Sequence, residues 1–267
     1  MQRYFIDLAY LGSPFHGWQV QPGAVSVQEI LEKALGTLMR VPRVAVTGAG
    51  RTDAGVNARR MIAHVDLPDD FIPDAEFLRR LNAITGRSIA VRSFTPVAPD
   101  AHARFDATER TYRYFVHTVD DPFAEPGRLS WRACGPALDF EAMNRAASLI
   151  LGRRDFTSFS KLHTDVKTNI CDLRAARWIP IDGQPGHWYF EIRADRFLRN
   201  MVRAVVGTLI SVGRGKMAPE DILKVLEAKD RSSAGTSMPG EALFLWDVKY
   251  PYYTAPTGIV GLRPAGN

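Results

Sequence analysis

Cysteine is scarce in this sequence: Cys134 and Cys171 are the only two, and they lie far apart. So few thiols exclude a disulfide framework and suit a reducing cytoplasm, where we expect the protein to be located. Patterns of metal ligands are missing too, because there is no Cys-x-x-Cys and no two of the six histidines have the spacing of ligands on one helix. The sequence therefore predicts neither a metal site nor a metal cofactor.

Long hydrophobic runs are also absent. The most apolar stretch, residues 197–212, is interrupted by Arg199 and Arg203, so it does not predict a membrane span. Apolar and polar residues already alternate over residues 3–10, which predicts a strand and leaves no room for a signal peptide. No Gly-x-Ser-x-Gly motif of a serine hydrolase occurs. We therefore expect no membrane partner and no serine nucleophile.

The sequence has only a small excess of positive charge. Lys and Arg outnumber Asp and Glu by 34 to 29, which gives a net charge of +5 and an isoelectric point near 9.3. This surplus is compatible with an anionic partner but does not identify one. With 267 residues and 46% hydrophobic residues, the chain can bury one large core or two modest ones.

The most informative stretch is the glycine-rich run at residues 48–58, Gly-Ala-Gly-Arg-Thr-Asp-Ala-Gly-Val-Asn-Ala. A dinucleotide-binding fingerprint would need glycine where Asp53 stands, and a P-loop would need lysine where Val56 stands. The run therefore presents an acid, Asp53, with Arg51 beside it, at the end of a short apolar segment. Two interpretations are open on these residues alone: a catalytic loop, or a surface turn with solvated charges.

The order of predicted elements repeats. The first half reads strand 3–10, a helix capped by Ser26, strands 43–47 and 61–67, a helix opened by Pro73 and strand 89–94. The second half reads strand 110–118, a helix from Asp139 to Gly152, strands 173–179 and 188–193, a helix at 197–212 ended by Gly213, an extra helix near Pro219 and strand 243–250. This order predicts an α+β protein of two ferredoxin-like halves with a central cleft between them. We expect the halves at residues 1–105 and 106–253, followed by a peripheral tail at 254–267.

Several short blocks, in this order, resemble one known family. They are residues 12–19 (Gly-Ser-Pro-Phe-His-Gly-Trp-Gln), 26–28, 48–58, 102–107, 110–114, 155–159 and 197–203. The set resembles the TruA-type tRNA pseudouridine synthases and extends from about residue 4 to Tyr250. One departure is Asn57, where many members have histidine, which bears on the detail of the loop rather than on its chemistry.

The resemblance implies the pseudouridine synthase fold with a mainly antiparallel sheet, and isomerisation of uridine to pseudouridine at positions 38, 39 and 40 of the tRNA anticodon arm. No redox cofactor is implied, because the reaction exchanges no electrons. Asp53 would attack the sugar C1′ or abstract a sugar proton. Arg203 would pair with Asp53, Arg51 would help to hold the flipped nucleotide, and Tyr112 would stack on the uracil. The family is usually homodimeric, so a homodimer is implied too.

Further cations could bind the RNA backbone. Arg196, Arg199 and Arg203 recur at intervals of three and four residues, which predicts that they share one face of a helix. Arg214 and Lys216 follow on a glycine-containing loop, and Arg110 opens an aromatic strand. Given a family that acts on tRNA, we expect substrate binding by Arg110, Arg196, Arg199, Arg214 and Lys216.

Simpler explanations exist for these residues. Arg203 could lie on the solvated face of an amphipathic helix, and Tyr112 could be a core residue of its strand. For the whole chain, one alternative is a non-catalytic RNA-binding protein. Its usual motif has glycine where Thr111 and Arg113 stand, which counts against it. A second alternative, an Asp-dependent hydrolase of a small nucleotide, would need a metal cluster or a phosphate-binding nest that the sequence does not show.

Overall fold

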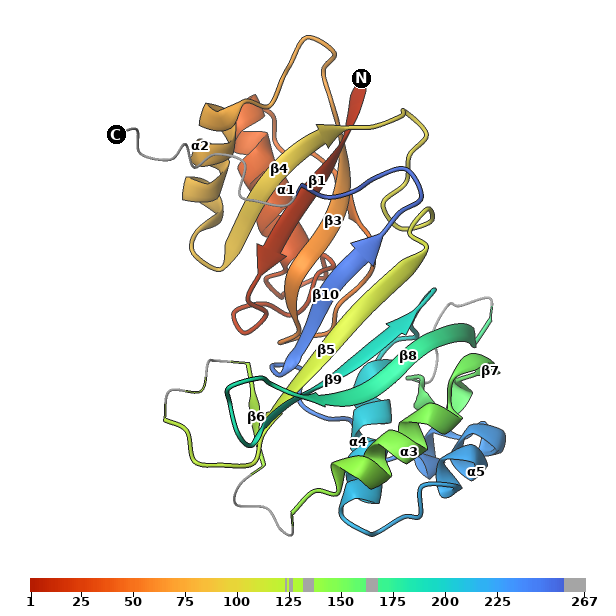
Figure 1. Ribbon diagram of the computed structural model, residues 1–267. Helices are drawn as coiled ribbons and strands as arrows, with labels where there is room; N and C mark the ends of the chain where they lie inside the picture. The colour runs from red at the N-terminus through yellow and green to blue at the C-terminus, as the bar shows by residue number, and fades with distance from the viewer. Residues whose placement is uncertain (123, 125–126, 132–136, 162–167, 257–267) are drawn as a thin grey trace. The chain divides into compact units, whose positions relative to one another are not determined.

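The computed structural model of this chain describes residues 1–122, 124, 127–131, 137–161 and 168–256. These residues form two compact units. The first contains residues 1–108 and 247–256, and the second lies within residues 109–246 (Figure 1). No helix in the described part of the chain is long and apolar enough to span a membrane.

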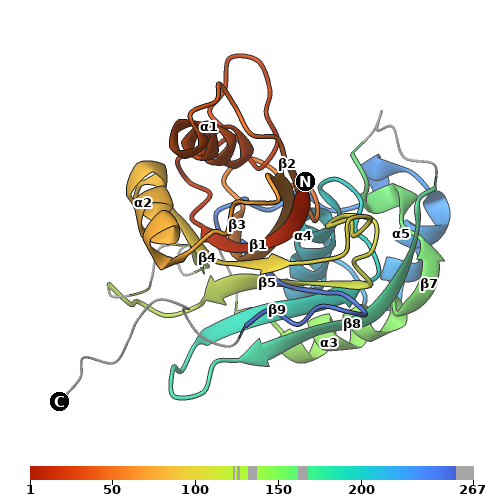
Figure 2. The same ribbon diagram turned by 90° about the horizontal axis from the view of Figure 1, so that it is seen from above.

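The first unit has β1 (Gln2–Tyr10) as its central strand. β1 pairs antiparallel with β3 (Asn57–Leu67) on one side and with β4 (Ile89–Pro96) on the other. The short strand β2 (Val46–Gly48) pairs antiparallel with β3. Figure 2 shows helices α1 (Val27–Met39) and α2 (Ala75–Thr85) on one face of these strands. The resulting order β1-α1-β2-β3-α2-β4 is the predicted ferredoxin-like one.

Local signals set both helix starts in this unit. The side chain of Ser26 accepts a hydrogen bond from the backbone N–H of Glu29, which confirms the predicted cap of α1. For α2 the capping residue is Asp74, whose carboxylate accepts from the N–H of Phe77 at 2.7 Å. Pro73 therefore precedes the cap instead of opening the helix. The predicted strand at 43–47 was placed too early, because β2 begins at Val46.

The second unit is built on four antiparallel strands in the order β5-β9-β8-β7. They are β5 (Glu109–His117), β9 (His187–Ala194), β8 (Ile170–Pro180) and β7 (Gly152–Asp155). A two-residue strand, β6 (Leu129–Ser130), runs parallel to β5. Figure 1 shows helices α3 (Phe140–Leu149), α4 (Met201–Gly213) and α5 (Asp221–Ala228) together on one side of β8 and β9. Two short 3₁₀ helices, η1 (Thr157–Phe159) and η2 (Arg231–Ser233), complete this unit.

Two predictions were wrong in the second unit. α4 begins at Met201 and not at residue 197, because Asn200 takes a left-handed conformation with φ of 67°. Arg196 and Arg199 therefore lie before the helix. α3 ends at Leu149, and Gly152, with φ of 87°, is the first residue of the unpredicted strand β7 rather than a helix stop.

The strand β10 (Leu243–Lys249) contributes residues to both units. From Asp247 on, the chain belongs to the first unit, as do residues 106–108, so the structural division differs from the expected ranges 1–105 and 106–253. The reason is aromatic packing: the rings of Tyr250 and Tyr253 lie 5.0 and 5.2 Å from that of Phe5 in β1. Of the expected tail, residues 257–267 lie outside the described residues.

Candidate active site

Asp53 lies on the loop between β2 and β3 of the first unit. Its side chain is half-buried, while that of Arg51 is exposed. The loop turns sharply, since the N–H of Val56 donates to the carbonyl of Asp53 and Gly55 has φ of 77°. Just before the acid, the buried hydroxyl of Thr52 hydrogen-bonds the hydroxyl of Tyr10, at 2.9 Å. Asp53 is thus attached to the rigid central strand through its neighbour.

The block at residues 12–19 is the support of this loop. The backbone N–H of Trp18 donates to the carbonyl of Thr52, and the N–H of Gly55 donates to the carbonyl of Phe15, both at 3.3 Å. These two bonds lie on either side of Asp53. The block at residues 12–19 is one of those that carry the family resemblance, and the sequence alone gives it no role. Its role in the structure is to hold the backbone on both sides of the acid.

Glycines make this close approach possible. A Cβ atom on Gly17, which has φ of 92°, would lie 2.3 Å from the carbonyl oxygen of Thr52. A Cβ on Gly12 would lie 2.3 Å from the carbonyl oxygen of Val56, and one on Gly48 would lie 2.5 Å from the Trp18 ring. Because real Cβ atoms do not come so close, only glycine fits at these three positions.

Asn57 also has a structural role. It is buried, and its side-chain oxygen accepts a hydrogen bond of 2.8 Å from the backbone N–H of Gly12. This bond satisfies a donor that is out of reach of water. The departure at position 57 is therefore accommodated by a direct link between the acidic loop and its support.

Tyr112 and Arg203 belong to the second unit. Tyr112 is a buried residue of β5, and its ring packs edge-on against that of Phe197, with centroids 5.1 Å apart. Arg203 is half-buried in the first turn of α4. Its Nε donates to the carbonyl of Met238, and the N–H of Met238 donates back to the carbonyl of Arg203. The bond from Nε restrains the guanidinium group, and the backbone bond holds the helix turn that carries it.

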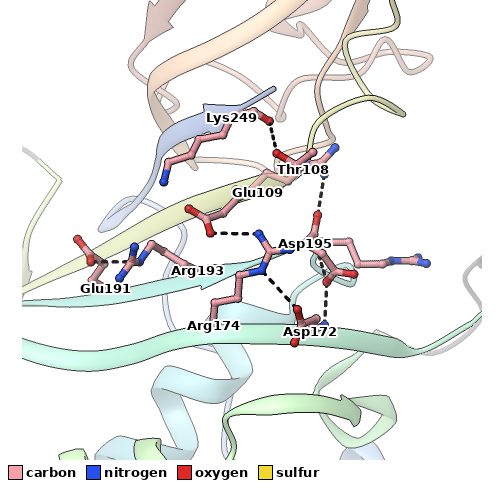
Figure 3. Close-up of polar contacts among 10 residues, drawn as sticks. Thr108, Glu109, Asp172, Arg174, Glu191, Arg193, Asp195 and Lys249 are labelled. Carbon is pink, nitrogen blue, oxygen red and sulfur yellow. Dashed lines mark hydrogen bonds and ion pairs between the residues drawn. The ribbon is translucent and has the colours of Figure 1, made fainter. Parts of the chain in front are cut away.

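Arg110 binds a residue that the sequence did not single out, Asp195, which directly precedes Arg196. The carbonyl of Asp195 accepts from the guanidinium of Arg110 at 2.7 Å. Its carboxylate accepts from the backbone N–H groups of Arg196 and Asp172, at 2.7 and 2.8 Å. Figure 3 shows Asp172 in turn paired with Arg174. Asp195 gave no signal in the sequence because its partners Arg110 and Asp172 lie on other strands, 85 and 23 residues away in the chain.

The remaining predicted cations are spread over the second unit. Arg199 is exposed, and its carbonyl accepts from the N–H of Lys161. The guanidinium of Arg214, just after α4, lies 5.8 Å from the ring centre of Trp131. Lys216 is exposed and lines a cavity of about 330 Å³ beside α5. The predicted single helix face of Arg196, Arg199 and Arg203 was wrong, because only Arg203 is helical.

The described residues contain no candidate metal site, because no three of their His, Cys, Asp or Glu side chains lie close enough together to bind one metal ion. Of the two cysteines, Cys171 is buried with a free thiol, and burial raises the pKa of that thiol to about 12. Cys134 lies outside the described residues.

Comparison with known proteins gives consistent matches. A family model described as tRNA pseudouridine synthase matches residues 146–251. The protein of Bacteroides thetaiotaomicron called tRNA pseudouridine synthase A is 55% identical over 94% of this chain and 91% of its own length. The Parabacteroides distasonis protein of the same name is 56% identical, covering 94% and 97% of the two chains. That of Bacillus subtilis is 38% identical, covering 93% and 99%.

Proposed function

Because the chain belongs to the tRNA pseudouridine synthase family, we propose that it isomerises uridine at positions 38, 39 and 40 of the tRNA anticodon stem-loop, starting from Asp53. The enzyme class, an isomerase that converts uridine in tRNA to pseudouridine, follows from the family. In this reaction the bond from uracil N1 to the ribose C1′ breaks and a bond from C5 to C1′ forms; C5 then releases its proton, and N1 takes one up. The observation that carries the proposal is the acid itself, held on a loop whose backbone is fixed on both sides.

Asp53 acts in one of two ways in this proposal. Its carboxylate either attacks C1′ directly or abstracts a sugar proton, and both routes need the ionised form. A guanidinium within about 4–6 Å favours that form, and we assign this part to Arg203. The hydrogen bond from Nε of Arg203 to the carbonyl of Met238 supports the assignment, because a guanidinium that is already held loses little conformational freedom when it pairs.

Tyr112 and Arg51 bind the target nucleotide and its surroundings in this proposal. The ring of Tyr112 stacks on the detached uracil while the base turns; such stacking is worth about 1–3 kcal/mol per base. The edge-on contact with Phe197 supports this role, since it fixes the plane of the tyrosine ring. Arg51, exposed on the same loop as Asp53, fills the gap that the flipped nucleotide leaves in the RNA stack.

The tRNA backbone binds the second unit through Arg110, Arg196, Arg199, Arg214 and Lys216. The hydrogen bond from the Arg110 guanidinium to the carbonyl of Asp195 supports this, because it holds that cation next to the backbone of Arg196. A homodimer, in which one tRNA arm contacts both subunits, is part of the same proposal. The prediction of a cytoplasmic location rests on the scarcity of cysteine.

The test is release of tritium from tRNA transcript labelled at uracil C5, without added metal or cofactor. We expect release by the wild type, and a loss of at least about 100-fold in Asp53→Asn, because a carboxylate acting as base or nucleophile contributes that much or more. Binding of tRNA to the variant should be unchanged. Asp70→Asn, at an exposed position before α2, is the matched control and should keep full activity.

Two results would contradict the proposal. Equal release by Asp53→Asn and the wild type would remove Asp53 from the mechanism. Tight tRNA binding without any release by the wild type would favour the non-catalytic RNA-binding alternative.

A further inference from the structure

Phe105 is an aromatic residue that the catalytic proposal leaves unused. It lies in the loop between β4 and β5 of the first unit, and 74% of its surface is exposed. A single exposed apolar side chain is common in proteins and needs no explanation by itself. What sets Phe105 apart is the way the loop presents it.

The loop fixes the backbone of Phe105 through hydrogen bonds. The ring nitrogen Nδ1 of His102 accepts from the N–H groups of both Arg104 and Phe105, at 3.1 and 3.3 Å. The carboxylate of Asp106 accepts from the N–H of His102 at 2.7 Å, and the N–H of Asp106 donates to the carbonyl of His102. Four bonds within five residues close this loop on itself.

Contacts with the rest of the first unit hold the loop in place. The N–H of Ala103 donates to Nδ1 of His64 in β3, at 3.1 Å, and the carbonyl of Ala103 accepts from the buried hydroxyl of Tyr250, at 2.6 Å. The hydroxyl of Tyr252 donates to the carboxylate of Asp106. An exposed ring on so constrained a backbone loses little entropy when a ligand covers it.

The surroundings of the ring indicate what that ligand is. One face of the ring lies 4.2 Å from the His102 ring, centroid to centroid and tilted by 32°. The guanidinium of Arg104, which is itself exposed, lies over the Phe105 ring, 5.8 Å from its centre. Exposed aromatic rings and guanidinium groups both stack on unpaired bases, and the positive charge attracts the neighbouring phosphate. A protein or lipid partner would favour a wider apolar patch.

We propose that Phe105, with Arg104 beside it, is a stacking platform for an unpaired base of the tRNA substrate, outside the catalytic residues. This inference rests on the proposed function for the identity of the RNA. The platform contributes binding energy before the chemical step. Its loss therefore weakens tRNA binding and raises KM, with little change in kcat.

The experiment compares Phe105→Ala with Phe105→Trp in the full chain, using tRNA transcript as the probe. We expect Phe105→Ala to raise the Kd for tRNA about 5- to 150-fold, the range that one base–aromatic stack provides. Phe105→Trp should bind at least as tightly as the wild type. The matched control is Ile72→Ala, at another exposed apolar position of the same unit (77% exposed), which should leave Kd and the melting temperature unchanged.

Three results separate the possibilities. If Phe105→Ala binds tRNA as tightly as Ile72→Ala does, the platform is refuted while the proposed function stands. If Phe105→Ala dissociates a dimer in sedimentation analysis, the ring is a subunit contact, and the platform is likewise refuted. If the wild type binds tRNA without isomerising it and Phe105→Ala weakens that binding, the platform is supported while the proposed function fails.

Discussion

Gly17→Ala would test whether the backbone around Asp53 depends on the block at residues 12–19. Gly17 has φ of 92°, and the added Cβ would lie 2.3 Å from the carbonyl oxygen of Thr52 and 3.1 Å from the carbonyl carbon of Asp53. Both neighbours are backbone atoms, so neither can move aside as a flexible side chain could. The loop that carries the acid must shift, or the strain must stay in the folded state.

The expected cost has two parts. A left-handed conformation costs an alanine about 1–2 kcal/mol, and overpacking against fixed atoms adds about 1–3 kcal/mol. The folded state therefore loses about 2–5 kcal/mol, a large share of the usual total of about 5–15 kcal/mol. Any shift of the loop also displaces Asp53, and a displacement of about 1 Å can reduce kcat on the order of 100-fold.

Gly23→Ala is the matched control for this prediction. Gly23 also has a positive φ, 72°, but nothing lies within 4 Å of its added Cβ. Thermal unfolding and tritium release from C5-labelled tRNA should be measured on both variants. We expect Gly17→Ala to melt lower than Gly23→Ala by roughly 2–10 °C and to lose most of its kcat, while Gly23→Ala keeps it. Equal melting temperatures and equal kcat values would refute the idea that residues 12–19 position the acid.

Two further predictions concern the first unit. Asn57→Ala leaves the buried N–H of Gly12 without its side-chain acceptor, so urea unfolding should show a loss of about 1–3 kcal/mol; an unchanged midpoint would contradict this. His64 is buried, and mainly through that burial, and next through the charge of Arg3, its pKa falls from 6.5 to about 4. The unfolded chain therefore binds more protons between these values, and the free energy of unfolding should drop by about 3 kcal/mol as the pH falls from 6.5 to 4. His64→Gln should flatten that pH dependence, and a variant with the wild-type slope would show that His64 is not its source.

Much of the secondary structure followed from local signals in the sequence. The alternation in β1, the Ser26 cap of α1 and the Asp139 cap of α3 each depend on residues a few positions apart. Where a helix boundary was predicted wrongly, the cause was a backbone conformation that the local sequence pattern does not reveal. The apolar spacing of residues 197–212 is helical throughout, yet the left-handed Asn200 makes α4 begin at Met201.

The family resemblance supplied the candidate residues but not the way in which they are held. Asp195, whose carbonyl binds the Arg110 guanidinium, was missed because Arg110 and Asp172, its partners, are well separated from it in the chain. The exposed ring of Phe105 was missed because the short block that contains it does not show which of its side chains face solvent.

The sequence by itself determined the family and most strand and helix positions, and it supplied Asp53 as the candidate catalytic acid, since these depend on residue identity and on short-range spacing. Only the tertiary structure decided what holds the acid. The contacts of Gly17 with Thr52 and of Asn57 with Gly12 join segments that are distant in the chain. Such contacts exist only after the strands have paired in one register, because pairing fixes which backbone carbonyl faces which glycine.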